Sequence, residues 1–145
     1  MPPFSMSDFN LDPTLSRDCF LLKETNYSLV LLMNNSLYYW FIIVPKVNVI
    51  EWFELDDELQ SAVMAQINEL SRWIKSNLAA DKINLASIGN VVSQLHIHVV
   101  GRRYVDVSWP AVVWGRAEKK TYTDDELKKI NVLFEAGVKF GEDVP

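Results

Sequence analysis

A chain of 145 residues has the length of one domain, and such a chain can bury about 70% of its unfolded surface without disulfides or metals. Apolar residues make up 49% and charged residues 23%, which argues against a disordered or low-complexity chain. The formal net charge of −5 argues against a nucleic-acid binder, because such proteins neutralise phosphates with clustered Lys and Arg.

The cysteine content and the hydropathy indicate the compartment. Cys19 is the single cysteine, so no disulfide can form within the chain, which suits a reducing environment. No segment approaches the ~18 apolar residues that cross a bilayer, and residues 1–8 lack the basic and apolar regions of a signal peptide. We therefore expect a cytoplasmic protein without a membrane partner.

Three strands are predicted in the first third of the chain. Apolar runs at residues 19–22 and 28–33 are separated by the polar residues 23–26, which suit a turn. The run at residues 37–44 is aromatic and β-branched without alternation, and Pro45 ends it. Such a run predicts a central strand that is covered on both faces.

An amphipathic helix is predicted at residues 57–78. Asp57 and Gln60 have the spacing of a capping box, in which each side chain satisfies a free backbone N–H at the helix start. The apolar positions recur at spacings of three and four, and they are Leu59, Val63, Ile67, Leu70 and Ile74.

A hairpin is predicted after this helix. Residues 82–86 can form a strand, Gly89 and Asn90 supply a turn, and residues 94–100 alternate with the period of an antiparallel strand.

A final helix is predicted from the capping box of Thr123 and Glu126 to about Lys139. No internal repeat and no linker rich in Gly or Ser divides the chain. We therefore expect residues 1–145 to form one domain.

Both histidines of the chain lie on the last predicted strand. Successive side chains of a strand point to opposite faces, so Gln94, His96 and His98 are predicted to line one face. The apolar residues between them face the other side, where they can cover a core. Three polar groups therefore converge on one surface.

Three hypotheses account for this polar row. In the first, both histidines are hydrogen-bonded structural groups, although burying several polar groups on one strand is costly. In the second, the His-x-His pair supplies two metal ligands, and Cys19, Asp106 or a Glu completes the site. In the third, a neutral imidazole attacks a phosphoryl group while the second imidazole assists the leaving oxygen.

Residues 94–102, QLHIHVVGR, resemble the signature of the histidine triad (HIT) superfamily, His-φ-His-φ-His-φ-φ with φ apolar. Gln94 stands where the family has its first histidine. Residues 89–92, Gly-Asn-Val-Val, are similar to the family's Gly-Gln-x-Val, and residues 41–46 resemble its apolar strand ending in Pro-Lys. The resemblance spans roughly residues 15–105.

The segment 106–145 forms a C-terminal tail and helix in this interpretation. Its Trp109-Pro110 and Val113-Trp114-Gly115 resemble a bacterial HIT-like group that carries the Gln variant. The two tryptophans suit a core position more than a catalytic one. Arg102 and Arg103 are expected to be solvated surface groups, with steering of an anionic substrate as the alternative.

The resemblance implies an α+β, HIT-like fold with an antiparallel sheet of about five strands and two main helices. It also implies a homodimer. It makes His96 the nucleophile on the α-phosphate of a nucleotide, and it makes His98 the ligand of the phosphate or leaving group. Gln94 can donate a hydrogen bond there, but it cannot titrate. The nucleotide is expected to contact Asn34, Asn84 and Asn90, although Asn34 and Asn90 suit turn positions equally well.

The predicted function is hydrolysis or transfer at the α-phosphate of a purine nucleotide conjugate through a nucleotidyl-His96 intermediate. A dinucleoside polyphosphate or a nucleoside phosphoramidate would serve as substrate, and the reaction requires no cofactor. Two alternatives stay open. Because Gln94 replaces a triad histidine, the first is a nucleotide-binding protein without turnover. The second is a metal-dependent enzyme that uses His96 and His98.

Overall fold

The computed structural model describes residues 9–141, and a five-stranded antiparallel sheet forms its centre. The strands lie in the order β1-β2-β3-β5-β4. Their bounds are Cys19–Glu24 for β1, Ser28–Met33 for β2, Tyr39–Pro45 for β3, Lys82–Ala86 for β4 and Ile97–Arg102 for β5. The α+β fold and the five-stranded sheet predicted from the sequence are confirmed.

The central strands are buried because apolar clusters cover both faces of the sheet. Every residue of β3 is buried except Tyr39, as the unbroken apolar run of this strand predicts. Alternate residues of β3 enter the two clusters: Phe41 and Ile43 belong to one, Trp40 and Ile42 to the other. Because β5 pairs with β3, its side chains also alternate between the two faces of the sheet.

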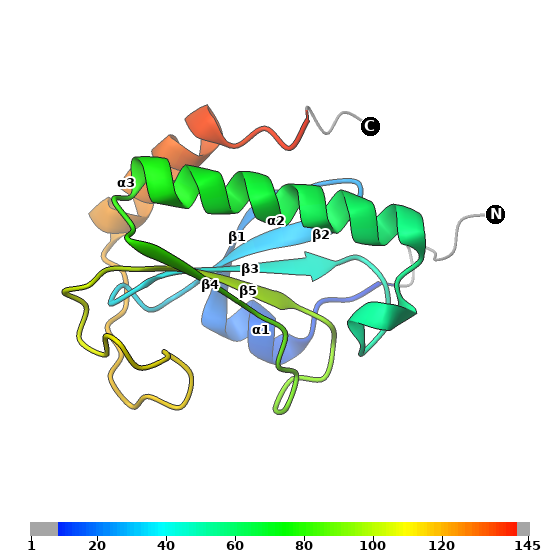
Figure 1. Cartoon of the computed structure of the whole chain (residues 1–145), viewed down its shortest axis with the longest axis horizontal. Coiled ribbons are helices and arrows are strands. Elements are labelled where there is room, and N and C mark those ends of the chain that lie inside the picture. The colour runs from blue at the N-terminus through cyan, green and yellow to red at the C-terminus, as the bar shows by residue number, and fades with distance from the viewer. Residues whose placement is uncertain (1–8, 142–145) are drawn as a thin grey trace.

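Helix α2, Asp57–Asn77, lies along one face of the sheet, as Figure 1 shows. The five apolar positions predicted to form its stripe are all buried in the cluster on that face. The predicted capping box is wrong by one position, because Asp56 is the N-cap: its Oδ1 accepts from the backbone N of Leu59 at 2.8 Å. Gln60 instead donates to the carbonyl of Leu55 at 3.0 Å. A short 3₁₀ helix, η2, spans Trp52–Glu54 just before it.

Helix α3, Asp124–Gly137, contributes buried residues to the same cluster as α2. Its predicted capping box is confirmed: Glu126 N donates to Thr123 Oγ1 at 3.2 Å, and Thr123 N donates to Glu126 Oε1 at 2.9 Å. The two main helices predicted from the sequence are thus present. No helix in the described part of the chain is long and apolar enough to cross a membrane.

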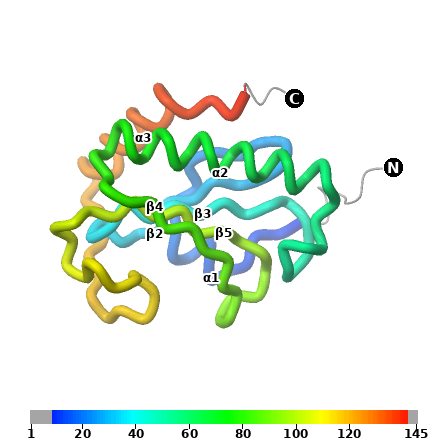
Figure 2. Tube along the Cα trace, in the orientation of Figure 1, coloured from blue at the N-terminus to red at the C-terminus, as the bar shows by residue number. Residues whose placement is uncertain are grey.

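Helix α1, Pro13–Asp18, lies on the opposite face of the sheet (Figure 1) and was not predicted. Asp12 is its N-cap and accepts from the backbone N of Thr14 at 2.8 Å. Proline at the first helical position is preorganised for a helix. The segments that follow β4 and β5 project on this same side, as the trace in Figure 2 shows.

Strand β5 begins at Ile97, three residues later than predicted. β4 and β5 pair as the predicted hairpin, but residues 87–96 connect them, with Gly89 at a φ of 70°. Leu95 donates its backbone N–H to the carbonyl of Val49 at 3.0 Å rather than to a neighbouring strand. Gln94 and His96 therefore precede the strand, and only His98 lies on it.

Candidate active site

His96 and His98 line one cavity of about 380 Å³ on the side of the sheet that carries α1. His98 lies between Ile42 of β3 and Ala86 of β4, and Ile42 belongs to the apolar cluster on that side. The other walls come from α1, from the ends of β2 and β3, from the segment after β4 and from the segment after β5. They are Thr14, Leu15, Asp18, Met33, Trp40, Ile88, Gly89, Asn90, Val91, Val92, Trp114 and Gly115.

His96 is held by the backbone. Its Nδ1 lies 2.6 Å from the carbonyl oxygen of Gln94. Because a carbonyl only accepts, Nδ1 must carry the proton, and in the neutral ring the lone pair is therefore on Nε2. An imidazole with its lone pair on Nε2 and its other nitrogen fixed has the form that a nucleophile requires.

His98 is held by a side chain. The indole Nε1 of Trp40 donates to His98 Nδ1 at 2.9 Å. The ring of His98 lies 4.9 Å from that of His96 and 5.3 Å from that of Trp114, edge to face in both cases. Burial and the neighbouring His96 lower the pKa of His98 to about 4, so this ring is neutral at pH 7.

Of the residues predicted to form the site, the structure brings together His96, His98 and Asn90. Gln94 lies outside the cavity lining, where its Oε1 accepts from the backbone N of Asp12 at 2.9 Å and its Nε2 donates to the carbonyl of Asn10 at 2.8 Å. The Gln94 side chain therefore ties the segment before α1 to the segment before β5.

The other two predicted amides are also outside the cavity lining. The side-chain oxygen of Asn34 accepts from the backbone N of Tyr122 at 2.9 Å. That of Asn84 accepts from Arg102 Nη1 at 3.1 Å. Both amides connect parts of the fold in this structure, and their contact with a nucleotide stays a prediction.

Comparison with known proteins identifies the family. The sequence model of the HIT domain matches residues 15–105. The chain belongs to the HIT domain family. A histidine triad protein from Sinorhizobium meliloti has a TM-score of 0.88 and 31% identity, with 92% of this chain and 99% of that chain covered. A second histidine triad protein, from Bradyrhizobium japonicum, has a TM-score of 0.87 and 30% identity, with 90% of this chain and 98% of that chain covered.

A third histidine triad protein, from Marinobacter aquaeolei, has a TM-score of 0.86 and 33% identity, covering 90% of this chain and 96% of that chain. No curated protein matches the chain. The HIT fold is thus shared over nearly the whole length of these structures.

Sequence reasoning missed the wall of the candidate site that α1 supplies. Thr14, Leu15 and Asp18 lie on one side of this short helix and line the cavity. Asp12-Pro13 is a helix-start signal, an N-cap residue followed by proline at the first helical position, and it could have revealed α1. The role of Trp40 left no local signal, because its contact with His98 depends on the pairing of β3 with β5.

The expectation that Arg102 is a solvated surface group is wrong. Its side chain is only 1% exposed and its Nε donates to Asp106 Oδ2 at 2.8 Å. The rings of Tyr38 and Trp109 lie 5.6 and 5.4 Å from its guanidinium carbon. Arg102 is thus a buried group that binds the segment after β5 to the sheet.

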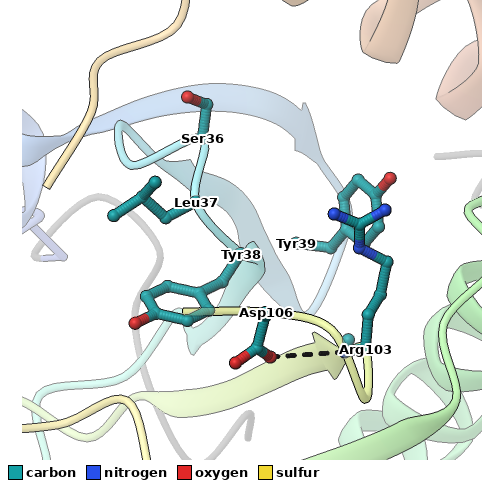
Figure 3. A pocket seen from close by; sticks show the side chains of 7 residues that line it. Ser36, Leu37, Tyr38, Tyr39, Arg103 and Asp106 are labelled. Carbon is teal, nitrogen blue, oxygen red and sulfur yellow. Dashed lines mark hydrogen bonds between the residues drawn. The ribbon is translucent and has the colours of Figure 1, made fainter. Parts of the chain in front are cut away.

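A second cavity, of about 50 Å³, lies beside this ion pair and has Arg103 and Asp106 among its lining residues (Figure 3). The dashed line in Figure 3 marks the bond from the backbone N of Arg103 to the Asp106 carboxylate. Ligand pockets usually measure about 300 Å³ or more, so this cavity has room for solvent rather than for a nucleotide.

The donors predicted to complete a metal site do not gather around the histidines. Within residues 9–141, no group of three or more His, Cys, Asp or Glu side chains is placed to hold a metal ion. Asp106 is bound to Arg102, and burial raises the pKa of Cys19 to about 12, so its thiol stays protonated. The His-x-His pair has no third ligand from these residues.

Proposed function

We propose that this HIT protein is a nucleotide hydrolase or nucleotidyl transferase that acts at the α-phosphate of a purine nucleotide conjugate. HIT proteins are commonly nucleotide hydrolases or transferases. The observation that carries the proposal is the pairing of His96 Nδ1 with a backbone carbonyl, which leaves the Nε2 lone pair on a ring that lines a large cavity.

In the proposed reaction, His96 Nε2 forms a bond to the α-phosphorus as the bond to the leaving group breaks. A phosphoramidate releases an amine, which takes its proton from solvent, and water then cleaves the nucleotidyl-His96 intermediate to the nucleoside monophosphate. The ring is a cation while Nε2 is bonded to phosphorus and Nδ1 keeps its proton. The Gln94 carbonyl 2.6 Å from Nδ1 stabilises that charge.

The glutamine variant is compatible with this chemistry. The contact that orients His96 comes from the backbone of Gln94 and is independent of the side chain at that position. We infer that the Gln94 side chain positions the site by holding the residues before α1, which itself lines the cavity. We also propose that the chain belongs to a bacterial group with this variant, since the three similar structures come from bacteria.

The charge of the cavity favours a phosphoramidate over a dinucleoside polyphosphate. No Lys or Arg occurs among its described lining residues, and Asp18 contributes a carboxyl group. A polyphosphate would lose hydration there without gaining a cation, whereas one phosphoryl group and an amine leaving group bring much less negative charge. The volume of about 380 Å³ suits a small-molecule ligand.

We further propose that the whole chain forms a single domain that assembles as a homodimer, as HIT proteins often do. Strand β4 lies at the edge of the sheet, and Leu85 on it is 52% exposed. An unpaired edge with an exposed apolar side chain is a surface that a second copy can cover. Light scattering coupled to gel filtration gives the mass that decides this.

The function is tested by incubating the purified protein with adenosine phosphoramidate and with diadenosine polyphosphates. We expect AMP release, fastest from the phosphoramidate, and a loss of several orders of magnitude in His96→Ala. Lys128→Ala is the control, because Lys128 is an exposed residue of α3 on the other side of the sheet. Nucleotide binding without AMP release would instead identify a binding protein, and abolition of turnover by a chelator would identify a metal enzyme.

A further inference from the structure

The hydrogen bond from Trp40 to His98 joins two buried side chains on neighbouring strands. Trp40 is 8% exposed and His98 is 6% exposed. In the β3–β5 pairing, Trp40 lies opposite Val100 and His98 opposite Ile42, so the two rings are diagonal neighbours on one face. Their centroids are 5.8 Å apart and the indole Nε1 is 2.9 Å from His98 Nδ1.

This bond decides where the proton of His98 lies. An indole nitrogen only donates, so the nitrogen that it contacts must be unprotonated. The neutral ring therefore carries its proton on Nε2, the ring nitrogen that Trp40 does not contact. His96 has the opposite form, with its proton on Nδ1 against the Gln94 carbonyl.

We propose that Trp40 is a positioning residue that holds His98 in the neutral, Nε2-protonated form, so that His98 offers a hydrogen-bond donor to the phosphoryl group beside the unprotonated Nε2 of His96. This inference deepens the proposed function and rests on it. Protonation of His98 on Nδ1 would break the bond to Trp40 and would place two N–H groups against each other.

The surroundings of His98 contain few groups that titrate. Among residues 9–141, the titratable side chains that line the cavity beside it are His96 and Asp18. A protonated His96 opposes a second positive charge on His98, whereas the Asp18 carboxylate favours one. The other elements packed against His98 contribute uncharged side chains, namely Trp40, Ala86 and Trp114.

The first test is independent of catalysis. The chain has only two histidines, so a protein labelled with ¹⁵N at histidine and tryptophan gives two imidazole patterns, which His96→Asn assigns. We expect His98 to be Nε2-protonated, His96 to be Nδ1-protonated, and a scalar coupling to connect Trp40 Nε1 with His98 Nδ1 across the hydrogen bond. A His98 ring protonated on Nδ1, or the absence of that coupling, overturns the proposal.

The second test removes the donor and leaves the aromatic packing. In Trp40→Phe we expect the pKa of His98 to rise by about one pH unit or more, because Nδ1 is then free to bind a proton. Trp114→Phe is the matched control: Trp114 also packs edge to face on His98, but its buried Nε1 has no hydrogen-bond partner in the described structure. An equal rise in both variants overturns the proposal, because burial alone would then explain the neutral ring.

A third variant covers the case in which Trp40→Phe fails to fold. Benzothienylalanine at position 40 keeps the shape of the indole and replaces its N–H by sulfur. The proposal expects the pKa of His98 to rise in this protein also, and an unchanged pKa contradicts it. If the wild-type protein shows the expected tautomers but releases no AMP, the proposed function fails while the role of Trp40 in holding His98 stands.

Discussion

Replacement of Asp106 by alanine tests the buried ion pair that binds the segment after β5 to the sheet. The Asp106 side chain is 2% exposed and that of Arg102 is 1% exposed. The carboxylate accepts from Arg102 Nε at 2.8 Å and Nη2 at 3.0 Å, and from the backbone N of Ser108 at 3.1 Å. It also accepts from the backbone N of Arg103 at 3.3 Å, the bond drawn in Figure 3.

Asp106→Ala leaves the guanidinium of Arg102 in the core without its counter-charge. Removing one partner of a buried ion pair costs about 3–5 kcal/mol. The Asn84 oxygen still accepts from Nη1 at 3.1 Å, so we expect the lower part of this range. The variant should lose about 3 kcal/mol of the free energy of unfolding, measured as a lower urea midpoint with an unchanged slope.

Asp81→Ala is the matched control for this experiment. Asp81 is exposed and accepts a single bond from the same segment, from the backbone N of Tyr104 at 2.9 Å. Its loss should cost about 1 kcal/mol or less. If Asp106→Ala destabilises the protein no more than Asp81→Ala does, the reasoning about the buried pair is refuted.

Three further substitutions test the fold and the electrostatics. Gly101→Ala should lower the free energy of unfolding by about 1–3 kcal/mol, because a Cβ there would lie 2.5 Å from Cγ2 of Ile74. An unchanged stability would show that α2 does not pack this closely against β5. Asp56→Ala should lower the free energy of unfolding by about 1 kcal/mol, and Asp57→Ala should lower it much less. The reverse order would show that Asp57 is the N-cap. The pKa of His98 is lowered from 6.5 to about 4, so its contribution to stability is fully present above pH 6.5 and is lost as the pH falls toward 4. The stability of the wild type relative to His98→Gln should therefore fall by about 3 kcal/mol between pH 7 and pH 4, and a constant difference would contradict the neutral ring.

The elements that could be predicted are those whose signals are local. Strand β2 has the predicted bounds, because a polar break precedes its apolar run and Asn34 follows it. Helix α2 differs from its prediction by one residue at its C-terminal end, since a long apolar stripe identifies a helix well. The signature around His96 and His98 predicted the family, which the HIT match confirms.

The features that could not be predicted depend on distant partners. The alternation of polar and apolar residues that predicted β5 includes Gln94. The Gln94 side chain nevertheless bonds to residues near α1, 82 and 84 positions away in the sequence. Arg102 is buried because Asp106 folds back onto it from a loop. Such a contact leaves no periodic pattern in the sequence. The wall that α1 adds to the cavity is likewise set by packing on the sheet and not by the residues around the histidines.

The most direct test of the central claim is the covalent intermediate itself. The protein is mixed with adenosine phosphoramidate and quenched in alkali within milliseconds, because a phosphorus–nitrogen bond to histidine survives in alkali, and the intact chain and its peptides are then weighed. We predict one added adenylyl group per chain, located on His96 and absent from His96→Ala. Turnover without an adduct on His96, or with the adduct on another residue, would contradict the account.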